Sequence, residues 1–415
     1  MRIGMFTDTY IPQINGVATS VFLLKQTLEA MDHQVFVFTT TDPEAKKSSE
    51  DGVYRVPSAP IFTERRLGMF YHPGLSREVK RLNLDIIHTH TEFSLGILGR
   101  NLASDLDLPL VHTYHTIYED YTHFVARGEP MNRVARSAAR ALTRSFCNIA
   151  EAVVVPTYKV KDLLMDYEVV SEINVVPTGI DLSRFQAPDG GQAWRAETRA
   201  ELGLREEQFV LINIGRVSEE KNLQEVLHVL SGWLPKHPEA VFVVVGDGAY
   251  RARLEELSVI HGIADQVIFT GYRPFGEIAR YYRLGDIFIS ASQSETQGLT
   301  YIEALASGLP VLARQDRCLE GVVFQEQNGL VYETEEEALG YLDRLISDRA
   351  LVKRMGETAE REVSTFSAET FAKRILRVYE SAQAAAEGLQ QSLTPRLGQA
   401  LSEQALNEQQ DQQKR

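Results

Sequence analysis

The sequence predicts an α/β protein built from two doubly wound domains, and three observations lead to this prediction. The chain has 415 residues, too many for one ordinary hydrophobic core and suited to two domains of about 180–200 residues each. Short runs rich in β-branched residues alternate with amphipathic helical stretches, which is the pattern of a parallel sheet covered by helices. A polar segment near the middle of the chain stops this alternation, which then starts again.

Strands and helices alternate in both halves of the chain. In the first half the predicted strands are Arg2–Thr7, Gln34–Thr40, Asp85–His90, Leu110–Tyr114 and Ala152–Pro156. The predicted helices there are Val17–Met31, Leu95–Asp105, Asn132–Ile149 and Lys159–Tyr167. In the second half the predicted strands are Phe209–Gly215, Val241–Gly246, Val267–Thr270, Ile287–Ser290 and Val311–Ala313. The predicted helices there are Leu223–Leu234, Arg251–His261, Gly276–Leu284 and Leu299–Ser307.

The junction between the halves is marked by Pro and Gly in Val176–Asp181 and by the polar stretch Gln186–Ala196, as expected of an interdomain hinge. A ligand is expected in a cleft between the two sheets, at the carboxyl ends of their strands. The predicted domains are residues 1–176 and 177–365, followed by a C-terminal helix, 366–385, that packs back toward the first domain. The Gln-rich end, 386–415, is expected to be a flexible tail.

Composition and charge narrow the class of protein. Hydrophobic residues make up 44% and charged residues 24% of the chain, as in a soluble globular protein, and no apolar run approaches the roughly 18 residues of a membrane span. The N-terminal residues lack the pattern of a secretion signal, and two distant cysteines fit no metal or redox spacing, so a cytoplasmic setting is expected. Of the net charge of −14, only −2 falls on residues 1–170, and the acidic balance argues against nucleic acid as a partner.

Two glycine-containing loops follow predicted strands and are candidate phosphate sites. Gly16 stands where the loop after the first strand opens a helix, so backbone N–H groups there can approach an anion; a simple strand–helix turn is the alternative. Gly215 opens the loop that carries Arg216 and Lys221, two cations that can grip a diphosphate. Acidic neighbours in this loop leave open that it is only a solvated turn.

The segment from Ser294 to Val311 carries the most specific motif. Glu295 lies in a strand-to-helix loop at the carboxyl edge of the second predicted sheet, and Glu303 lies in the helix that starts at Gly298. Both carboxylates can therefore face one ligand, and the first amides of the helix can face it as well. Helix capping by Glu295 is the alternative role. The remaining candidate contacts of this segment are Thr296, Gln297 and Leu299.

A cluster of polar side chains follows the strand Leu110–Tyr114. His112 and His115, with carboxylates nearby, could be metal ligands, but they lie on an irregular loop far from any cysteine. We expect no metal site, and we expect His115 to line the polar ligand site. Asp120 in the same segment is a weak candidate for acceptor binding or proton transfer.

Five arginines lie in one stretch of the first half with only one opposing carboxylate. Four of them are spaced by three or four residues on one face of the predicted helix, next to apolar side chains, and such a helix can lie on anionic lipid. A solvated face over a core stripe is the alternative. The arginines are Arg127, Arg133, Arg136, Arg140 and Arg144.

Taken together, these residues resemble the retaining family 4 glycosyltransferases of GT-B fold, which have two Rossmann-like domains facing each other across a cleft. The resemblance covers about residues 1–380 and is most specific in the Gly215–Asn222 loop and the Glu295–Glu303 motif. The segments FTDTYIPQINGVATS, HTYHTIYEDY and SETQGLTYIEALASGLPVLA are similar to the bacterial subgroup that glycosylates diacylglycerol for membrane glycolipid and lipoteichoic acid anchors.

The resemblance implies a role for each residue. The Gly16 amide, Arg216 and Lys221 would contact the diphosphate of a UDP-sugar, and charge compensation there would be the main catalytic effect. Glu295 would bind the sugar and Glu303 the ribose, while His115 would bind the far hydroxyls of the sugar. The first domain would bind the acceptor and face the membrane, placing the protein peripherally on its cytoplasmic face. The resemblance also implies front-face displacement with retention of the anomeric configuration, and no requirement for a divalent metal.

Three alternatives stay open at this point. The acceptor could be diacylglycerol, a diacylglycerol that already carries one hexose, or a soluble polyol. The sugar could be glucose or galactose. A non-catalytic nucleotide-sugar-binding subunit is a different class of protein, but such proteins often lose the basic pair or the first glutamate, and all four residues are present here.

Overall fold

The computed structural model describes residues 1–13, 15–45, 51–62, 65–68, 73–121, 129–186 and 192–388. The chain forms two compact units. The first comprises Met1–Val155, Leu163–Val176 and the chain from Ala372, and the second comprises Pro156–Asp162 and Pro177–Phe371. Within the described ranges, no helix combines the length and the apolar character that crossing a bilayer demands.

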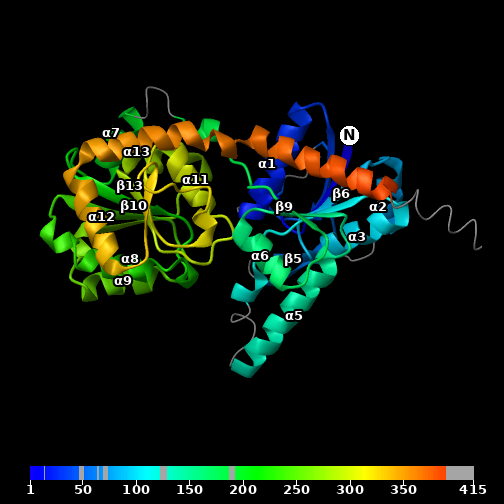
Figure 1. Ribbon diagram of the computed structural model, residues 1–415, viewed down its shortest axis with the longest axis horizontal. Helices are drawn as coiled ribbons and strands as arrows, with labels where there is room; N and C mark the ends of the chain where they lie inside the picture. The colour runs from blue at the N-terminus through cyan, green and yellow to red at the C-terminus, as the bar shows by residue number, and fades with distance from the viewer. Residues whose placement is uncertain are drawn as a thin grey trace, which may run out of the picture. The chain divides into compact units, whose positions relative to one another are not determined.

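The first unit is built on a seven-stranded parallel sheet with the order β3-β2-β1-β6-β7-β8-β9. The strands β6, β7 and β8 are buried at every residue, because helices cover both faces of a parallel sheet (Figure 1). A two-stranded antiparallel sheet, β4 and β5, is added to it. The strands are β1 (Arg2–Phe6), β2 (Gln34–Thr40), β3 (Val53–Val56), β4 (Ser58–Phe62), β5 (Arg65–Gly68), β6 (Ile86–Thr89), β7 (Leu110–Thr113), β8 (Ala152–Val155) and β9 (Glu172–Val175). The helices are α1 (Gly16–Ala30), α2 (Pro73–Arg81), α3 (Ser94–Leu106), α5 (Glu129–Cys147) and, from Leu163 onward, the second half of α6 (Tyr158–Asp166).

The second unit is built on a six-stranded parallel sheet with the order β12-β11-β10-β13-β14-β15. Buried apolar side chains fill both of its faces and form two core clusters, one on each side of the sheet. The strands are β10 (Phe209–Ile214), β11 (Ala240–Val245), β12 (Val267–Gly271), β13 (Ile287–Ser290), β14 (Val311–Arg314) and β15 (Gly329–Tyr332). The helices are α7 (Gln192–Glu201), α8 (Leu223–Ser231), α9 (Arg251–Ile260), α10 (Ile278–Leu284), α11 (Leu299–Ala306), α12 (Glu335–Ser347) and α13 (Arg349–Glu362).

The prediction of two parallel α/β units is confirmed, and each predicted strand is present with its ends shifted by at most two residues. The polar stretch Gln186–Ala196, expected at the interdomain hinge, belongs to the second unit, and α7 starts in it at Gln192. This helix has few apolar residues, and it is tied to the unit by the buried Arg199, which donates to the carbonyls of Arg205, Glu206 and Gln208. Charged hydrogen bonds of this kind leave no apolar periodicity in a sequence.

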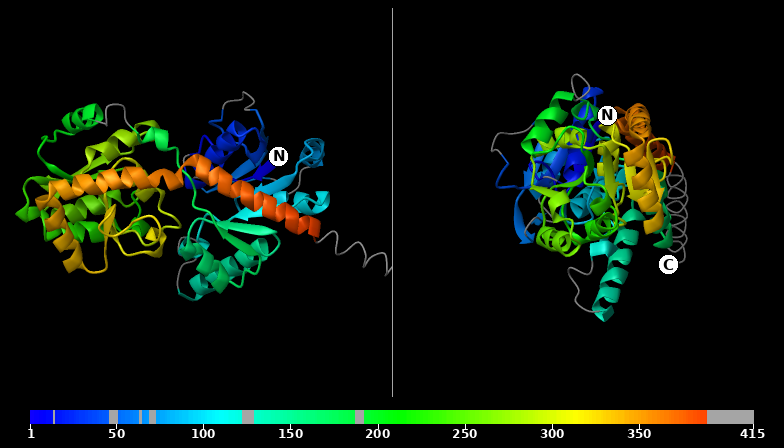
Figure 2. Two further views of the ribbon diagram at one scale, coloured as in Figure 1. Left: turned by 45° about the horizontal axis from the view of Figure 1, so that its top comes forward. Right: turned by 90° about the vertical axis from the view of Figure 1, so that its left-hand side faces the viewer.

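The end of the chain returns to the first unit. A helix runs over residues 368–388, and from Ala372 it belongs to the first unit (Figure 2). Its buried side chains Ile375, Val378 and Tyr379 recur at helical spacing, and the Tyr379 hydroxyl lies 2.7 Å from Nδ1 of His88 in β6. Residues 156–162 group with the second unit, although the expected boundary placed them in the first. Most of the expected tail, 389–415, lies outside the described residues.

Candidate functional site

The order of the strands brings two loops of the second unit together. β10 pairs with β11 on one side and with β13 on the other, so the strand order reverses at β10. Ligands of open α/β sheets bind at such a point, outside the carboxyl ends of the strands. The loop after β10 carries Arg216 and Lys221, and the loop after β13 carries Glu295. Both predicted loops therefore lie at the carboxyl ends of neighbouring strands of the same sheet.

The loop after β10 is shaped by a close approach of two glycines. A Cβ atom on Gly246, which follows β11, would lie 1.9 Å from the carbonyl oxygen of Gly215. Gly215 itself has a φ of 151°, a backbone conformation that side chains disfavour. The Arg216 guanidinium that follows is about half exposed and lies 3.0 Å from the Glu220 carboxylate. Arg216 is therefore placed at the rim of the sheet, paired with an acidic neighbour of its own loop.

Lys221 and Glu295 form an ion pair between the two loops. The Lys221 Nζ atom donates to Oε1 of Glu295 over 2.6 Å, and the two side chains are 28% and 15% exposed. Partial burial makes this pair stronger than a surface ion pair, since water screens it less. Glu295 is not a helix cap, because α11 starts at Leu299 with Gly298 as its N-cap residue, and no side chain caps this helix. Two residues that the sequence placed at one ligand are in direct contact here.

The loop that carries Glu295 is held by residues that sequence reasoning missed. Lys159, in the first turn of α6, donates to the carbonyls of Gln293 (3.0 Å) and Glu295 (3.1 Å) and to the Asp316 carboxylate (2.8 Å). The Thr157 hydroxyl donates to the carbonyl of Thr296 over 2.8 Å. All of these residues belong to the second unit. No pattern in a single sequence relates a lysine near residue 160 to a loop near residue 295.

Of the residues after Glu295, Gln297 is bonded within the fold, and Gly298 and Leu299 form the start of α11. The Gln297 side chain is buried and accepts from the Thr178 N–H at 2.8 Å while donating to the Thr178 carbonyl at 2.9 Å. Its amide is therefore engaged within the unit. Gly298 adopts a left-handed conformation with a φ of 73°, and a Cβ atom there would lie 2.4 Å from the ring of Tyr301. Leu299 is the first residue of α11 and is partly exposed.

Glu303 lies in the second turn of α11 and is bonded to a neighbouring helix. The hydroxyl of Tyr282 in α10 donates to Oε2 of Glu303 over 2.7 Å. Burial of the carboxyl group raises the pKa of Glu303 to about 7, although the bond from Tyr282 acts in the opposite direction. An ionised carboxylate is therefore costly at this position unless a ligand contributes further hydrogen bonds.

The predicted residues of the first unit follow β1 and β7. Gly16 is exposed at the first position of α1, and the preceding Asn15 caps the helix by accepting from the Ala18 N–H at 2.9 Å. His115 follows β7 and lies 3.1 Å from a ring nitrogen of His90, which follows β6. Asp120 lies in a short 3₁₀ helix, Tyr118–Tyr121, and its side chain is outside the described residues.

His112 does not accompany His115. It is buried within the unit, with Nε2 3.2 Å from the carboxylate of Glu92 and Nδ1 2.9 Å from the hydroxyl of Thr89. Within the ranges that the structure describes, no group of three or more His, Cys, Asp or Glu side chains is arranged to hold a metal ion. The two histidines of the HTYH segment thus have separate environments.

The arginines of α5 lie on a helix that extends away from the sheet of the first unit (Figures 1 and 2). Arg133, Arg136, Arg140 and Arg144 are all exposed. Arg140 forms an ion pair with Glu119, and Arg144 forms one with Glu168. The apolar side chains of Met131, Val134 and Leu142 on this helix are exposed as well, at 61%, 65% and 44%. Arg127 lies outside the described residues.

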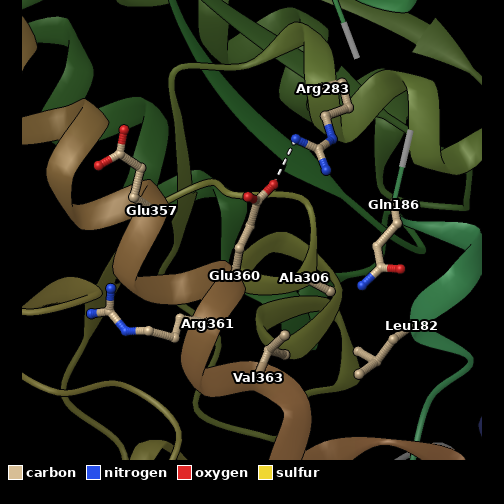
Figure 3. Close-up of a pocket in the computed structure, with 8 residues that line it drawn as sticks. All are labelled: Leu182, Gln186, Arg283, Ala306, Glu357, Glu360, Arg361 and Val363. Carbon is tan, nitrogen blue, oxygen red and sulfur yellow. Dashed lines mark ion pairs between the residues drawn. The ribbon is translucent and has the colours of Figure 1, made fainter. Parts of the chain in front are cut away.

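A pocket of about 430 Å³ lies elsewhere in the second unit, between α10, the end of α11 and α13. Figure 3 shows its charged lining, in which Arg283 forms an ion pair of 2.7 Å with Glu360. None of the residues that the sequence placed at the ligand lines this pocket. We therefore assign it no part in the candidate site.

Two family models and several known proteins match most of the chain. Residues 14–184 match the model of Glycosyltransferase Family 4, and residues 195–362 match that of Glycosyl transferases group 1. An alpha-monoglucosyldiacylglycerol synthase of Streptococcus pneumoniae is 42% identical over 385 residues, which are 91% of this chain and 85% of that protein. The chain belongs to glycosyltransferase family 4. A synthase of the same name from Acholeplasma laidlawii is 31% identical over 91% of this chain and 96% of its own length.

Solved structures confirm the GT-B fold of this family 4 enzyme. A sucrose-phosphate synthase from Thermosynechococcus elongatus superposes with a TM-score of 0.75 at 22% identity, over 93% of this chain and 100% of that chain. The Anabaena protein HepE, solved in complex with UDP, superposes with a TM-score of 0.72 at 18% identity, over 92% and 100%. At this level of identity the likeness concerns the fold, and the expected fold class is confirmed.

Proposed function

We propose that this chain is a retaining 1,2-diacylglycerol 3-alpha-glucosyltransferase, which transfers glucose from UDP-glucose to diacylglycerol and forms alpha-monoglucosyl-diacylglycerol. The observation that carries the proposal is the 42% identity, over 91% of this chain, to a protein named for that product. The product is a membrane glycolipid and a precursor of lipoteichoic acid anchors. The alternative reaction is the addition of a second hexose to monoglucosyl-diacylglycerol, and the choice of acceptor in the assay must distinguish the two.

The geometry of the second unit supports a nucleotide-sugar site at the edge of its sheet. Lys221 is held by Glu295 at 2.6 Å, so that its ammonium group is fixed before a diphosphate reaches it. Arg216, on the exposed side of the same loop, adds a guanidinium that can bind phosphate oxygens in bidentate fashion. Glu295 accepts hydrogen bonds from hydroxyl groups of the sugar, and Glu303, with the start of α11 at Gly298 and Leu299, faces the ribose and phosphates.

Catalysis in this proposal rests on the leaving diphosphate. As the bond between the anomeric carbon and the phosphate oxygen breaks, negative charge grows on the diphosphate, and Arg216 and Lys221 compensate it. The leaving phosphate oxygen takes the proton of the acceptor hydroxyl, which attacks from the same face and retains the configuration. The two cations replace the charge that a divalent metal supplies in other transferases, so activity is expected to persist in a chelator.

The first unit supplies the acceptor side and the membrane contact in this proposal. α5 presents exposed arginines and the exposed apolar side chains Met131, Val134 and Leu142. A helix of this composition binds at the interface of an anionic bilayer, with each arginine near the surface adding about 1 kcal/mol. The protein would then lie peripherally on the cytoplasmic face, where its lipid acceptor and its nucleotide-sugar donor are both available.

A transfer assay with two donors and two acceptors tests the proposal. The purified full chain is incubated with radiolabelled UDP-glucose or UDP-galactose and with diacylglycerol or monoglucosyl-diacylglycerol in anionic micelles. Labelled product from UDP-glucose and diacylglycerol alone is expected. Product only from the glycosylated acceptor would replace the proposed reaction with addition of a second hexose.

Site variants test the assigned residues in the same assay. Lys221→Ala and Glu295→Ala are each expected to lower kcat by at least about 100-fold, because each removes a charge that faces the diphosphate or the sugar. Circular dichroism should show both variants folded. Glu357→Ala, an exposed carboxylate on α13 away from the site, is the matched control and should keep its activity. Full activity of either site variant would contradict the assignment.

A further inference from the structure

His115 contacts a second histidine, His90, which no sequence motif marked. Nδ1 of His90 lies 3.1 Å from Nε2 of His115. The ring centroids are 5.4 Å apart and the ring planes differ by 27°. This separation matches the N···N contact extended by the two ring radii, so the rings meet edge to edge and close to coplanar. A ring N–H···N hydrogen bond requires this edge-to-edge contact, because the N–H and the accepting lone pair each lie in the plane of their ring.

The contact between the two rings is a hydrogen bond in which one ring donates an N–H and the other accepts it. Burial, together with neighbouring histidines, lowers the pKa of His90 well below its usual range, and burial with His112 nearby lowers the pKa of His115 to about 3. Both imidazoles are therefore neutral at neutral pH, and each has one N–H. Either His90 donates to His115 or His115 donates to His90. The choice determines which nitrogen of each ring carries the other proton.

The outer nitrogen of His90 distinguishes the two arrangements. His90 is only 2% exposed, and its Nε2 atom has no hydrogen-bond partner among the residues that the structure describes. If His115 donated, the proton of His90 would reside on this Nε2 atom as a buried N–H without an acceptor. Buried N–H groups without a partner are rarer in proteins than acceptors that are not fully satisfied. The arrangement in which His90 donates is therefore favoured.

We propose that His90 is a positioning residue that donates its Nδ1–H to Nε2 of His115, so that His115 carries its own proton on Nδ1. His115 then presents a hydrogen-bond donor to the ligand, and its Nδ1 atom cannot act as a base. The tautomer follows from the geometry of the first unit. That the recipient is a sugar oxygen of the donor rests on the proposed function.

The surroundings of His90 are consistent with a fixed ring. The ring of His88 packs against it with a centroid distance of 4.0 Å and an interplanar angle of 39°. His88 is itself fixed at both nitrogens, with Nδ1 2.7 Å from the hydroxyl of Tyr379 and Nε2 2.6 Å from the hydroxyl of Thr113. Both nitrogens of His88 are therefore engaged within the first unit.

Nuclear magnetic resonance on the full chain with ¹⁵N-labelled histidine tests the tautomer directly. Two-bond ¹H–¹⁵N correlations distinguish protonated from unprotonated ring nitrogens, and the His115 signals are identified by their loss in His115→Gln. We expect Nδ1 of His115 to be protonated and Nε2 to be unprotonated. The opposite pattern would overturn the proposal. This readout needs no substrate, so it stands whether or not glucosyl transfer is found.

Two substitutions test whether His90 sets the tautomer. His90→Phe keeps a ring but removes the donor, and His115 is expected to lose its single tautomer while KM for UDP-glucose rises about tenfold. His90→Asn keeps an N–H near the position of Nδ1 and should restore the tautomer and most of the affinity. Tyr379→Phe, which removes only the bond to His88, is the control and should leave His115 unchanged. An unaltered tautomer in His90→Phe, or the same loss in Tyr379→Phe, would overturn the role of His90.

Discussion

Replacing Glu303 with glutamine is expected to stabilise the second unit at high pH while impairing the reaction. Burial raises the pKa of Glu303 from 4.5 to about 7. Between these pH values the folded protein keeps a proton that the unfolded chain has lost, so the stability of the wild type falls as pH rises. Below pH 4.5 both states are protonated and no cost remains; above pH 7 the cost reaches about 3 kcal/mol.

The difference between variant and wild type isolates this one carboxyl group, because glutamine does not titrate. The gain in the free energy of unfolding from Glu303→Gln should therefore increase by about 2 kcal/mol between pH 5 and pH 8. Urea unfolding followed by tryptophan fluorescence measures it. Both tryptophans, Trp194 and Trp233, lie in the second unit together with Glu303.

A matched control and two outcomes decide this prediction. Glu357→Gln replaces an exposed carboxylate of α13, and its effect should stay within about 0.5 kcal/mol at both pH values. A gain from Glu303→Gln that is equal at pH 5 and pH 8 would show that burial does not perturb this carboxyl group. A stabilised variant with unchanged KM for UDP-glucose would refute the proposed contact with the ribose.

Three further predictions concern the loop that carries Glu295, binding to anionic membranes and activity without a divalent metal. Lys159→Met removes the donor that holds the carbonyls of Gln293 and Glu295, so KM for UDP-glucose should rise about tenfold, whereas Lys161→Met on the same helix should have no such effect. An unchanged KM in Lys159→Met would show that the loop needs no support from α6. The double variant R133Q/R136Q should bind anionic vesicles at least about tenfold more weakly in sedimentation, with binding to neutral vesicles unchanged; equal losses on both vesicle types would contradict an electrostatic role. EDTA should leave transfer within about twofold of its untreated rate, and a loss that Mg²⁺ restores would contradict catalysis by Arg216 and Lys221.

The two parallel sheets and their order along the chain were predictable from the sequence. Central strands of such sheets are buried on both faces, so they appear as continuous β-branched runs, and every predicted strand is present. Three of the missed elements lack this signal for a physical reason. The edge strands β3 and β9 are only partly buried, and α7 places one large apolar side chain, Trp194, against the core beside the hydrogen bonds of the buried Arg199.

The residue types of the candidate site were also recognisable, because each follows a predicted strand at the edge where parallel sheets bind ligands. The sequence placed Lys221 and Glu295 in two loops, but it contained no sign that they touch. They are 74 residues apart and meet at 2.6 Å since β13, and not β12, pairs with β10. Strand order is a long-range property that local periodicity does not encode.

Chain order and residue chemistry therefore identified the fold class, the loops and the charged groups of the candidate site. Tertiary contacts alone supplied their partners: Lys159 beneath the Glu295 loop, Tyr282 on Glu303 and His90 against His115. Each of these contacts joins elements separated by at least one whole strand or helix. Their geometry depends on how buried surfaces pack, and local patterns along a single sequence do not reveal that packing.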